Sequence, residues 1–259
     1  MDSGASMFLT GLDVMRNRTA VVKVSTGAKE VDEILGGGIE TQSITEFFGE
    51  FRTGKTQMMH TLCVTCQMPK ASVGGAEGRA VYVDTEGNFR PERVTQIAQR
   101  FGLNPDEAKN VLTTRVFNHE QQMSTVKQIA GICVENGPVK VVIIDSIMAL
   151  FRAEFCGRGE LSERQQKIGR HLAELTQLAT EFNLAVILAN QCMADPGAMA
   201  MFATVKPVGG NVLAHASTWR VMLKKGRGDE RIAKIFDSPS MPEAEATFRI
   251  SEGGVCSTD

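Results

Sequence analysis

The chain has 259 residues, of which 42% are hydrophobic and 22% charged, and its formal net charge is −2. This composition supports a substantial core and excludes a disordered chain. The near balance of charge means that any contact with a polyanion must come from local basic loops. The sequence has no apolar run of about 18 residues and no signal-peptide pattern, so we expect a chain that neither spans a membrane nor is secreted.

The six cysteines are scattered along the chain, which favours reduced thiols over a disulfide framework. Cys63 and Cys66 have C-x-x-C spacing but fall inside a predicted helix, with no second cysteine pair. We interpret them as small buried residues and keep a metal or redox role as the alternative.

The first third of the chain alternates short apolar strands with helices. Three glycines at 36–38 end the first helix, since glycine favours neither helix nor strand. In chain order we expect a strand at 21–24, a helix at 29–35, a strand at 44–48, a helix at 57–67, a strand at 80–84 and a helix from Pro91 to about 101.

Between the strand at 44–48 and the helix at 57–67 lies a Gly-x-x-x-x-Gly-Lys-Thr segment. In a phosphate-binding loop of this pattern, backbone amides and a helix N-terminus point at the phosphates. Lys55 would reach the β- and γ-phosphates and Thr56 would bind Mg²⁺. A chance glycine-rich turn is the alternative, but the flanking strand and helix favour the loop. The predicted nucleotide contacts are Gly49, Glu50, Phe51, Arg52, Thr53, Gly54, Lys55, Thr56 and Gln57.

The middle of the chain continues the alternation, with a strand at 111–117, a helix at 119–135, a strand at 139–144, a helix at 161–182 and a strand at 184–189. Such alternation predicts a right-handed, doubly wound, mostly parallel α/β sheet. Residues 193–210 are then predicted to be a mobile loop. Segments 219–223 and 231–236 form a hairpin and 246–250 a last strand, which makes a C-terminal antiparallel extension.

Three polar residues follow buried strands: Glu86, Asp145 and Gln191. Ligands bind at the carboxyl ends of strands in an open α/β sheet, so these residues are site candidates. Asp145 is placed to hold Mg²⁺, with a helix cap as its alternative. Glu86 is a candidate to activate the water that attacks the γ-phosphate, or else a surface carboxylate paired with a nearby arginine. Gln191 is a candidate γ-phosphate sensor.

Several motifs together resemble the core of the eukaryotic RecA-like recombinases over about residues 8–254. They are the phosphate loop, Asp84-Thr-Glu-Gly87 with Phe89-Arg-Pro-Glu-Arg93, Gly157-Arg-Gly-Glu-Leu161, His215-Ala-Ser217 and Lys225-Gly-Arg-Gly228. Asp145-Ser-Ile-Met-Ala-Leu-Phe-Arg152 and Ala194-Asp-Pro-Gly-Ala198 resemble the meiosis-specific branch, whereas Asp84-Thr-Glu-Gly87 is closer to the mitotic form.

The resemblance implies a RecA-like P-loop ATPase that coats single-stranded DNA as a filament and exchanges it with a homologous duplex. It implies ATP and Mg²⁺ as cofactors. The implied partners are single-stranded and double-stranded DNA, recombination mediator proteins and further copies of the chain, assembled head to tail as a filament or a ring. It also implies no membrane and a location in the nucleus. On the matching positions, Glu86 resembles the catalytic base, Gln191 the γ-phosphate sensor and Arg93 an adenine-side contact. His215 and the Asp237, Ser238 and Pro239 segment match residues that touch ATP on a neighbouring protomer.

The same resemblance implies two DNA-binding loops. Arg152, Arg158 and Arg164 match the first, and residues 193–207 match the second, where we expect Lys206 to contact the backbone and Met199, Met201 and Phe202 to separate bases. Taken singly, each arginine is also readable as a solvated surface charge. The basic hairpin at 224–231 likewise either contacts DNA or carries solvated surface charges.

Phe8-Leu-Thr-Gly11 resembles the tether that inserts an aromatic residue into the neighbouring protomer, with Gly11 in place of an alanine. We therefore expect residues 1–20 to be a disordered leader with this polymerisation tether, and residues 21–259 to be the ATPase core, without the family's helical N-terminal DNA-binding domain. Trp219 stands where the family has threonine. Two rival functions remain, a non-catalytic ATP-binding scaffold and a hexameric helicase motor.

Overall fold

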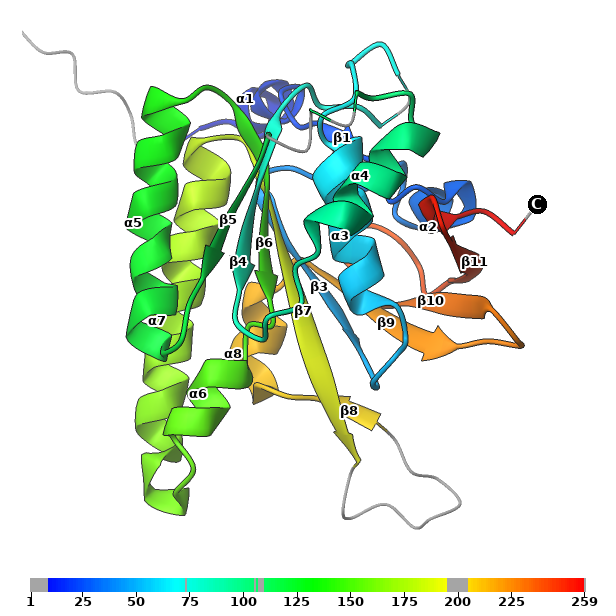
Figure 1. Ribbon diagram of the computed structural model, residues 1–259. Coiled ribbons are helices and arrows are strands. Elements are labelled where there is room, and N and C mark those ends of the chain that lie inside the picture. Colours follow the sequence, from blue (N-terminus) through cyan, green and yellow to red (C-terminus); the bar gives the residue numbers. More distant parts are fainter. Residues whose placement is uncertain (1–8, 73, 105, 107–109, 195–204, 259) are drawn as a thin grey trace, which may run out of the picture.

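The computed structural model describes residues 9–72, 74–104, 106, 110–194 and 205–258. Figure 1 shows a central twisted sheet with helices on both of its faces. The helices are α1 (Gly11–Arg18), α2 (Lys29–Ile34), α3 (Lys55–Thr65), α4 (Pro91–Arg100), α5 (His119–Glu135), α6 (Ala149–Glu154), α7 (Leu161–Glu181) and α8 (Gly210–Ala216), with a 3-10 turn at Arg158–Glu160.

The strands are β1 (Lys23–Val24), β2 (Ile39–Glu40), β3 (Ser43–Gly49), β4 (Arg79–Asp84), β5 (Val111–Arg115), β6 (Val139–Asp145), β7 (Ala185–Ala194), β8 (Val205–Pro207), β9 (Trp219–Lys225), β10 (Glu230–Asp237), β11 (Glu245–Ser251) and β12 (Gly254–Cys256). The large sheet has the order β12-β11-β10-β9-β3-β7-β6-β4-β5. In this order, neighbouring strands from β9 through β3, β7, β6 and β4 to β5 pair parallel. The neighbours from β12 through β11 and β10 to β9 pair antiparallel. This architecture confirms the predicted fold class.

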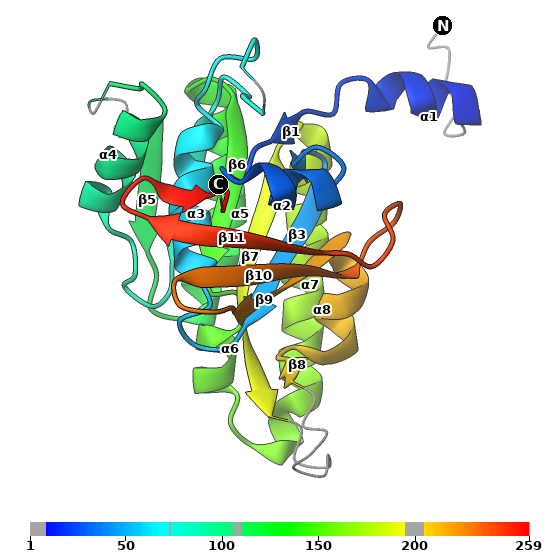
Figure 2. The same ribbon diagram turned by 90° about the vertical axis from the view of Figure 1, so that its right-hand side faces the viewer.

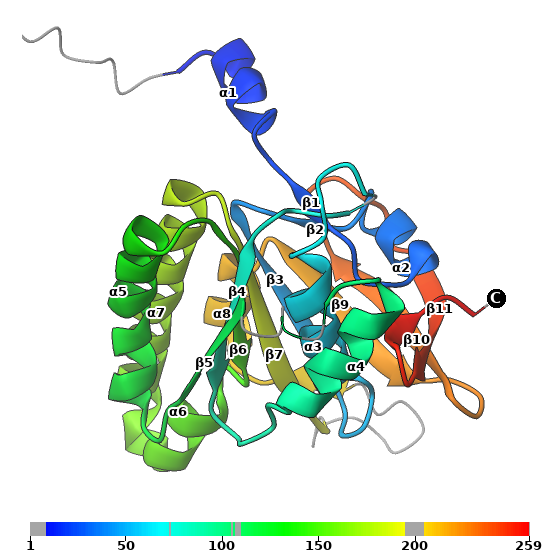
Figure 3. The same ribbon diagram turned by 45° about the horizontal axis from the view of Figure 1, so that its top comes forward.

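The sheet separates two apolar cores, and Figure 3 shows the helices that lie on its two sides. Helices α5, α6, α7 and α8 cover one face, while α2, α3 and α4 cover the other. Strand β6 reads Val-Lys-Val-Val-Ile-Ile-Asp and is buried almost throughout, as expected for a parallel strand with helices on both sides. Its last residue, Asp145, is therefore carried to the same edge as the phosphate loop that follows β3.

The structure differs from the sequence-based elements after residue 189. Strand β7 continues to Ala194 because β8 pairs antiparallel with Cys192–Ala194, so Gln191 lies within a strand and not just beyond one. The predicted loop at 193–210 therefore contains β8, and helix α8 follows it. Helix α8, which has seven residues and begins with a glycine, was not predicted from the sequence.

The expectation of a disordered leader is wrong for Gly11–Arg18, which form helix α1. Thr10 and Asp13 cap this helix reciprocally, because the Thr10 Oγ1 accepts from the Asp13 amide at 3.2 Å and the Asp13 carboxylate accepts from the Thr10 amide at 3.1 Å. Figures 2 and 3 show α1 standing away from the sheet. Its Leu12 and Met15 are 52% and 62% exposed.

Trp219 opens β9, opposite Thr45 of β3, and is 2% exposed within the core that α3 and α4 cover. The tryptophan thus fills interior volume. The next residue, Arg220, is also buried, and its Nε donates to Glu46 Oε2 at 2.7 Å. Asn190 Nδ2 donates to the other Glu46 oxygen at 2.7 Å, so the buried carboxylate ties β3, β7 and β9 together beneath the phosphate loop.

His171 of α7 makes stability depend on pH. It is fully buried, its Nδ1 has no hydrogen-bond partner, and burial lowers the pKa of His171 to about 4 from 6.5. His171 binds a proton more tightly in the unfolded chain than in the folded one. The free energy of unfolding is therefore not reduced by His171 above pH 6.5, and it falls as the pH drops from 6.5 towards 4.

Between pH 7.5 and pH 5 we expect His171 to cost about 2 kcal/mol of unfolding free energy. Urea unfolding of the parent and of His171→Leu at both pH values checks this. The parent should lose about 2 kcal/mol more than the variant. Equal losses in the two proteins would show that His171 is protonated as readily in the folded chain as in the unfolded one.

Candidate nucleotide site

A cavity of about 870 Å³ opens at the carboxyl ends of the central strands. This volume suits a nucleotide-sized ligand. All of residues 49–57 line it, together with Glu86, Asn88, Arg90, Arg93, Asp145, Ser146, Gln191, Cys192, Asp229, Arg231 and Ile250. The structure thus brings together the predicted phosphate loop and the predicted strand-end residues Glu86, Asp145 and Gln191.

Two glycines of the loop are required by geometry. A Cβ on Gly49 would lie 2.3 Å from the carbonyl oxygen of Leu223 on the neighbouring strand β9. Gly54 has a φ of 102° at the N-cap of α3, a left-handed conformation that favours glycine. No side chain caps the first turn of α3, so its amides are available to an anion.

Lys55 begins α3 and turns back over the loop. Its Nζ donates to the carbonyl oxygens of Gly49 and Glu50 at 2.8 and 2.7 Å. Burial lowers the pKa of Lys55 from 10.5, and the nearby Cys192 and Asp145 oppose that change. The ammonium group therefore lies at the cavity wall, over the loop where phosphates are expected.

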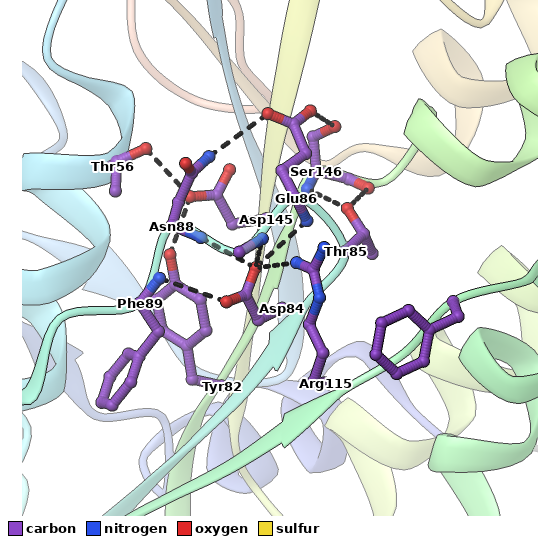
Figure 4. A network of polar contacts seen from close by, with 12 residues as sticks. Thr56, Tyr82, Asp84, Thr85, Glu86, Asn88, Phe89, Arg115, Asp145 and Ser146 are labelled. Atoms are coloured by element: carbon purple, nitrogen blue, oxygen red, sulfur yellow. Dashed lines mark hydrogen bonds and ion pairs between the residues drawn. The ribbon is translucent and has the colours of Figure 1, made fainter.

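Thr56 and Asp145 are in direct contact. The Thr56 Oγ1 donates to Asp145 Oδ2 at 2.9 Å, and the Tyr82 hydroxyl donates to the same oxygen at 2.7 Å (Figure 4). Burial raises the pKa of Asp145, partly offset by these two hydrogen bonds. A hydroxyl and a carboxylate that meet beside a phosphate loop form the oxygen donor set that Mg²⁺ prefers. These residues fit the ion, and the helix-cap interpretation of Asp145 finds no support.

The Glu86 carboxylate is held by three neutral donors. Its Oε1 accepts from Ser146 Oγ at 2.7 Å and from Gln191 Nε2 at 2.9 Å, while its Oε2 accepts from Asn88 Nδ2 at 3.2 Å. Arg90 instead donates to the backbone carbonyls of Gly87 and Phe89. The structure therefore joins Glu86 to Gln191 across the cavity and does not pair it with a nearby arginine.

Arg93, the predicted adenine-side contact, lines the same cavity from α4. Its Nε donates to Gln57 Oε1 at 2.7 Å, and its terminal nitrogens donate to the carbonyls of Ser251 and Glu252. The guanidinium thus joins α3 and α4 to the β11–β12 turn. The apolar side chain of Ile250, which the sequence analysis did not single out, completes this wall.

The residues predicted to act on a neighbouring protomer do not line this cavity. His215 lies on α8, which packs on α7, on the face of the sheet opposite α3. Asp237 ends β10 opposite Arg220. The cavity is bordered instead near the start of that strand, by Arg231 within it and by Asp229 just before it. Ser238 and Pro239 follow Asp237. Within one chain these residues are thus separated from the phosphate loop.

The predicted DNA-binding residues follow the ends of β6 and β7. Arg152 is half-buried near the end of α6, and Arg164 Nη1 donates to the Phe155 carbonyl at 3.3 Å. Lys206 is exposed on β8. In Figure 1, α6 and β8 lie at the same end of the molecule. Phe8, Met199, Met201 and Phe202 lie outside the described residues, and so does the side chain of Arg158.

Several residues of the cavity were not predicted from the sequence. Ser146 directly follows Asp145 and gave a signal by its position at a strand end, whereas Asn88 and Cys192 gave none. Cys192 is half-buried, and burial raises its pKa to about 11. Cys63 and Cys66 are fully buried with raised pKa values, which supports the interpretation of small core residues.

The described part of the chain holds no group of three or more His, Cys, Asp or Glu side chains arranged for a metal ion. A membrane-crossing helix is likewise not found among those residues. A parallel sheet with an antiparallel extension, a phosphate loop after β3 and an acidic residue at the end of the buried strand β6 together define a RecA-like P-loop domain.

The chain belongs to the Rad51 family, whose model matches residues 17–258. It is 53% identical over 256 residues to the meiotic recombination protein DLH1 of Candida albicans, covering 97% of this chain and 78% of the relative. It is 56% identical over 242 residues to the meiotic recombination protein DMC1 of Saccharomyces cerevisiae, covering 92% and 72%. The DMC1 homolog B of Oryza sativa subsp. japonica is 51% identical over 251 residues, covering 96% and 72%. These similarities confirm the resemblance to the meiosis-specific branch.

Proposed function

We propose that the chain is a DNA-stimulated ATPase that binds single-stranded DNA as a head-to-tail filament and exchanges it with a homologous duplex in meiotic recombination. The observation that carries this proposal is the direct hydrogen bond between Gln191 and Glu86 in a cavity that also contains Lys55, Thr56 and Asp145. This set matches the parts that phosphoryl transfer to water requires.

In this mechanism the loop amides and Lys55 hold the phosphates, and the Glu86 carboxylate orients and deprotonates the attacking water. Thr56 and Asp145 would hold Mg²⁺, which neutralises charge that develops on the phosphates. Arg93 and Ile250 lie on the cavity wall that would receive the adenine side. The phosphate chemistry thus needs positioning and charge, and the described side chains offer both.

The contacts of Gln191 support a coupling between nucleotide binding and DNA binding. Its side chain donates to Glu86, its carbonyl accepts from the Val208 amide at 3.0 Å, and its strand β7 pairs antiparallel with β8. A γ-phosphate that accepts a hydrogen bond from the Gln191 amide would remove one of the two hydrogen bonds to Glu86 Oε1, so that this oxygen could accept one from water. It would also shift the paired ends of β7 and β8, which belong to the segment proposed to contact DNA.

We infer that the site is shared between copies of the chain. His215 and the segment from Asp237 to Pro239 lie apart from the cavity of their own chain, which supports a role for them at the cavity of a neighbour. The exposed apolar residues of α1 support Phe8 and Gly11 as part of a contact with the next protomer. We propose residues 1–20 as this tether and 21–259 as the ATPase core. Recombination mediator proteins and a nuclear location belong to the same proposal.

ATP hydrolysis measured with and without single-stranded DNA, together with electron micrographs of the complex, tests this function. We expect DNA to stimulate hydrolysis and filaments to form with ATP. The main rival is a non-catalytic scaffold of the same family, which would bind ATP without turnover. The engaged Glu86 and Gln191 pair favours the enzyme. Nucleotide binding without hydrolysis, in the presence of DNA, would favour the scaffold.

Replacement of Arg152 by alanine is expected to weaken binding to single-stranded DNA, because the change removes one cation near the end of α6. The slope of log affinity against log salt should fall by about 0.7 if this side chain contacts one phosphate. Titration of a labelled oligonucleotide at several salt concentrations measures it. Lys127→Ala, which removes an exposed cation from α5, should leave the slope unchanged. An unaltered slope for Arg152→Ala would exclude the assignment of this arginine.

A further inference from the structure

The proposed hydrolysis leaves one buried carboxylate of the site without a role. Asp84, the last residue of β4, is 6% exposed and does not line the nucleotide cavity. Its Oδ1 accepts from the backbone amides of Glu86, Gly87 and Asn88 at 3.1, 2.6 and 3.1 Å, and its Oδ2 accepts from the Phe89 amide at 3.2 Å. Figure 4 shows these bonds converging on the one side chain.

The four amides belong to the turn that carries Glu86. Residues 86–89 lie between β4 and α4, outside helix and strand, so regular secondary structure does not fix their backbone. Buried or partly buried amides need acceptors, and a carboxylate with two oxygens supplies several at once. Bonds from amides to a charged acceptor are also stronger than neutral ones. The Asp84 carboxylate thus fixes the backbone of residues 86–89 through hydrogen bonds to their four amides.

A second strand reaches the same carboxylate. Arg115, at the end of the edge strand β5, donates from Nη1 to Asp84 Oδ1 at 2.9 Å. The guanidinium also lies against the turn, because a Cβ on Gly87 would be 3.3 Å from Arg115 Nη1. Gly87 has a φ of 80°, which favours glycine there. At the far end of the turn, the Arg90 amide donates to His60 Nε2 at 3.0 Å.

We propose that Asp84 and Arg115 are positioning residues that fix the backbone of residues 86–89 and so place the Glu86 carboxylate between Ser146 and Gln191. This inference rests on the proposed ATPase function for its catalytic consequence, but the clamp itself is a property of the backbone. Asp84 acts through Glu86 and does not touch the nucleotide. A carboxylate displaced by about 1 Å would lose on the order of 100-fold in hydrolysis.

Hydrogen–deuterium exchange tests the clamp without any reference to activity. In the parent we expect protection of the amides of residues 86–89. Asp84→Asn replaces one acceptor oxygen with an NH₂ group, so these amides should exchange about tenfold faster or more. Arg115→Gln, at a side chain that is 38% exposed, should give a smaller increase in a folded protein. Unchanged exchange in both variants would overturn the clamp.

Kinetics then test the consequence for Glu86. Asp84→Asn should lower kcat for ATP by about 10- to 100-fold and leave the Kd for a fluorescent nucleotide within about twofold. Because Asp84 acts through Glu86, the double variant Asp84→Asn/Glu86→Gln should be no slower than Glu86→Gln alone. Multiplied losses in the double variant, or a nucleotide Kd raised as strongly as kcat is lowered, would overturn the positioning role.

Glu40→Gln is the matched control. Glu40 is 8% exposed and contacts Arg18 and Lys23 at 3.4 and 3.5 Å, so it is also a buried carboxylate with cationic partners, but it lies outside the cavity. The Glu40→Gln variant should leave the hydrogen–deuterium exchange of residues 86–89 and the kcat for ATP unchanged. If the parent did not hydrolyse ATP, the proposed function would fail, whereas the exchange experiment would still decide the clamp.

Discussion

Lys55→Ala is expected to abolish measurable nucleotide binding, with affinity lowered by on the order of 100-fold or more. The Lys55 ammonium is the cation that is expected to reach the β- and γ-phosphates, and its Nζ also holds the loop through the carbonyls of Gly49 and Glu50. Alanine removes both the positive charge that would face the phosphates and the two hydrogen bonds from Nζ to the loop carbonyls. If occupancy of the loop controls assembly between protomers, filament formation should be lost with it.

Titration with a fluorescent ATP analogue measures this effect. Lys29→Ala is the control, since the Lys29 side chain is 81% exposed on α2 and its one ion pair among the described residues is with Glu33. It should bind nucleotide like the parent. If Lys55→Ala retained normal DNA-stimulated hydrolysis, the assignment of the loop as the nucleotide site would be wrong.

Glu86→Gln is expected to retain ATP binding and to lose turnover by about 10²- to 10⁴-fold, the range of a general base. Glutamine keeps the size of the side chain, and its carbonyl oxygen still accepts from Ser146 and Gln191. It no longer takes a proton from water. The loss should therefore fall on kcat, while nucleotide affinity stays within about twofold.

Phosphate release at saturating ATP and DNA, beside nucleotide titration, separates the two quantities. Glu92→Gln is the matched control, because Glu92 is an exposed glutamate in the first turn of α4 that does not line the cavity. A hydrolysis rate for Glu86→Gln equal to that of the parent would make Glu86 an ordinary surface carboxylate.

Much of the fold was readable from the sequence, because long apolar runs and helical periodicity dominate it. The helix at 119–135 and the strand that ends at Asp145 were predicted within about one residue, since one is bounded by a Gly-Pro pair and the other is a β-branched run. Helix α8 was missed because seven residues that begin with glycine carry little periodicity. Helix α1 was missed because its cap depends on a single Thr10–Asp13 pair.

The candidate site divides in the same way. Lys55, Thr56, Asp145 and Gln191 were predicted because a spaced motif and the ends of apolar strands mark them. Asp84 ends a strand as visibly as Asp145 does, but its role depends on the turn folding back over its own carboxylate, which no spacing encodes. The contribution of Arg115 requires knowing that β5 lies beside β4. Pairing between strands is a tertiary property, so sequence periodicity could not supply it.

In the proposed function, ATP bound at this site drives exchange of DNA strands. The most direct test of this function is a strand-exchange assay with a labelled single-stranded oligonucleotide and a homologous duplex, run with and without ATP and Mg²⁺. We expect ATP-dependent strand exchange by the parent chain and none by Lys55→Ala. Nucleotide binding and hydrolysis by the parent without any strand exchange would contradict the proposed function.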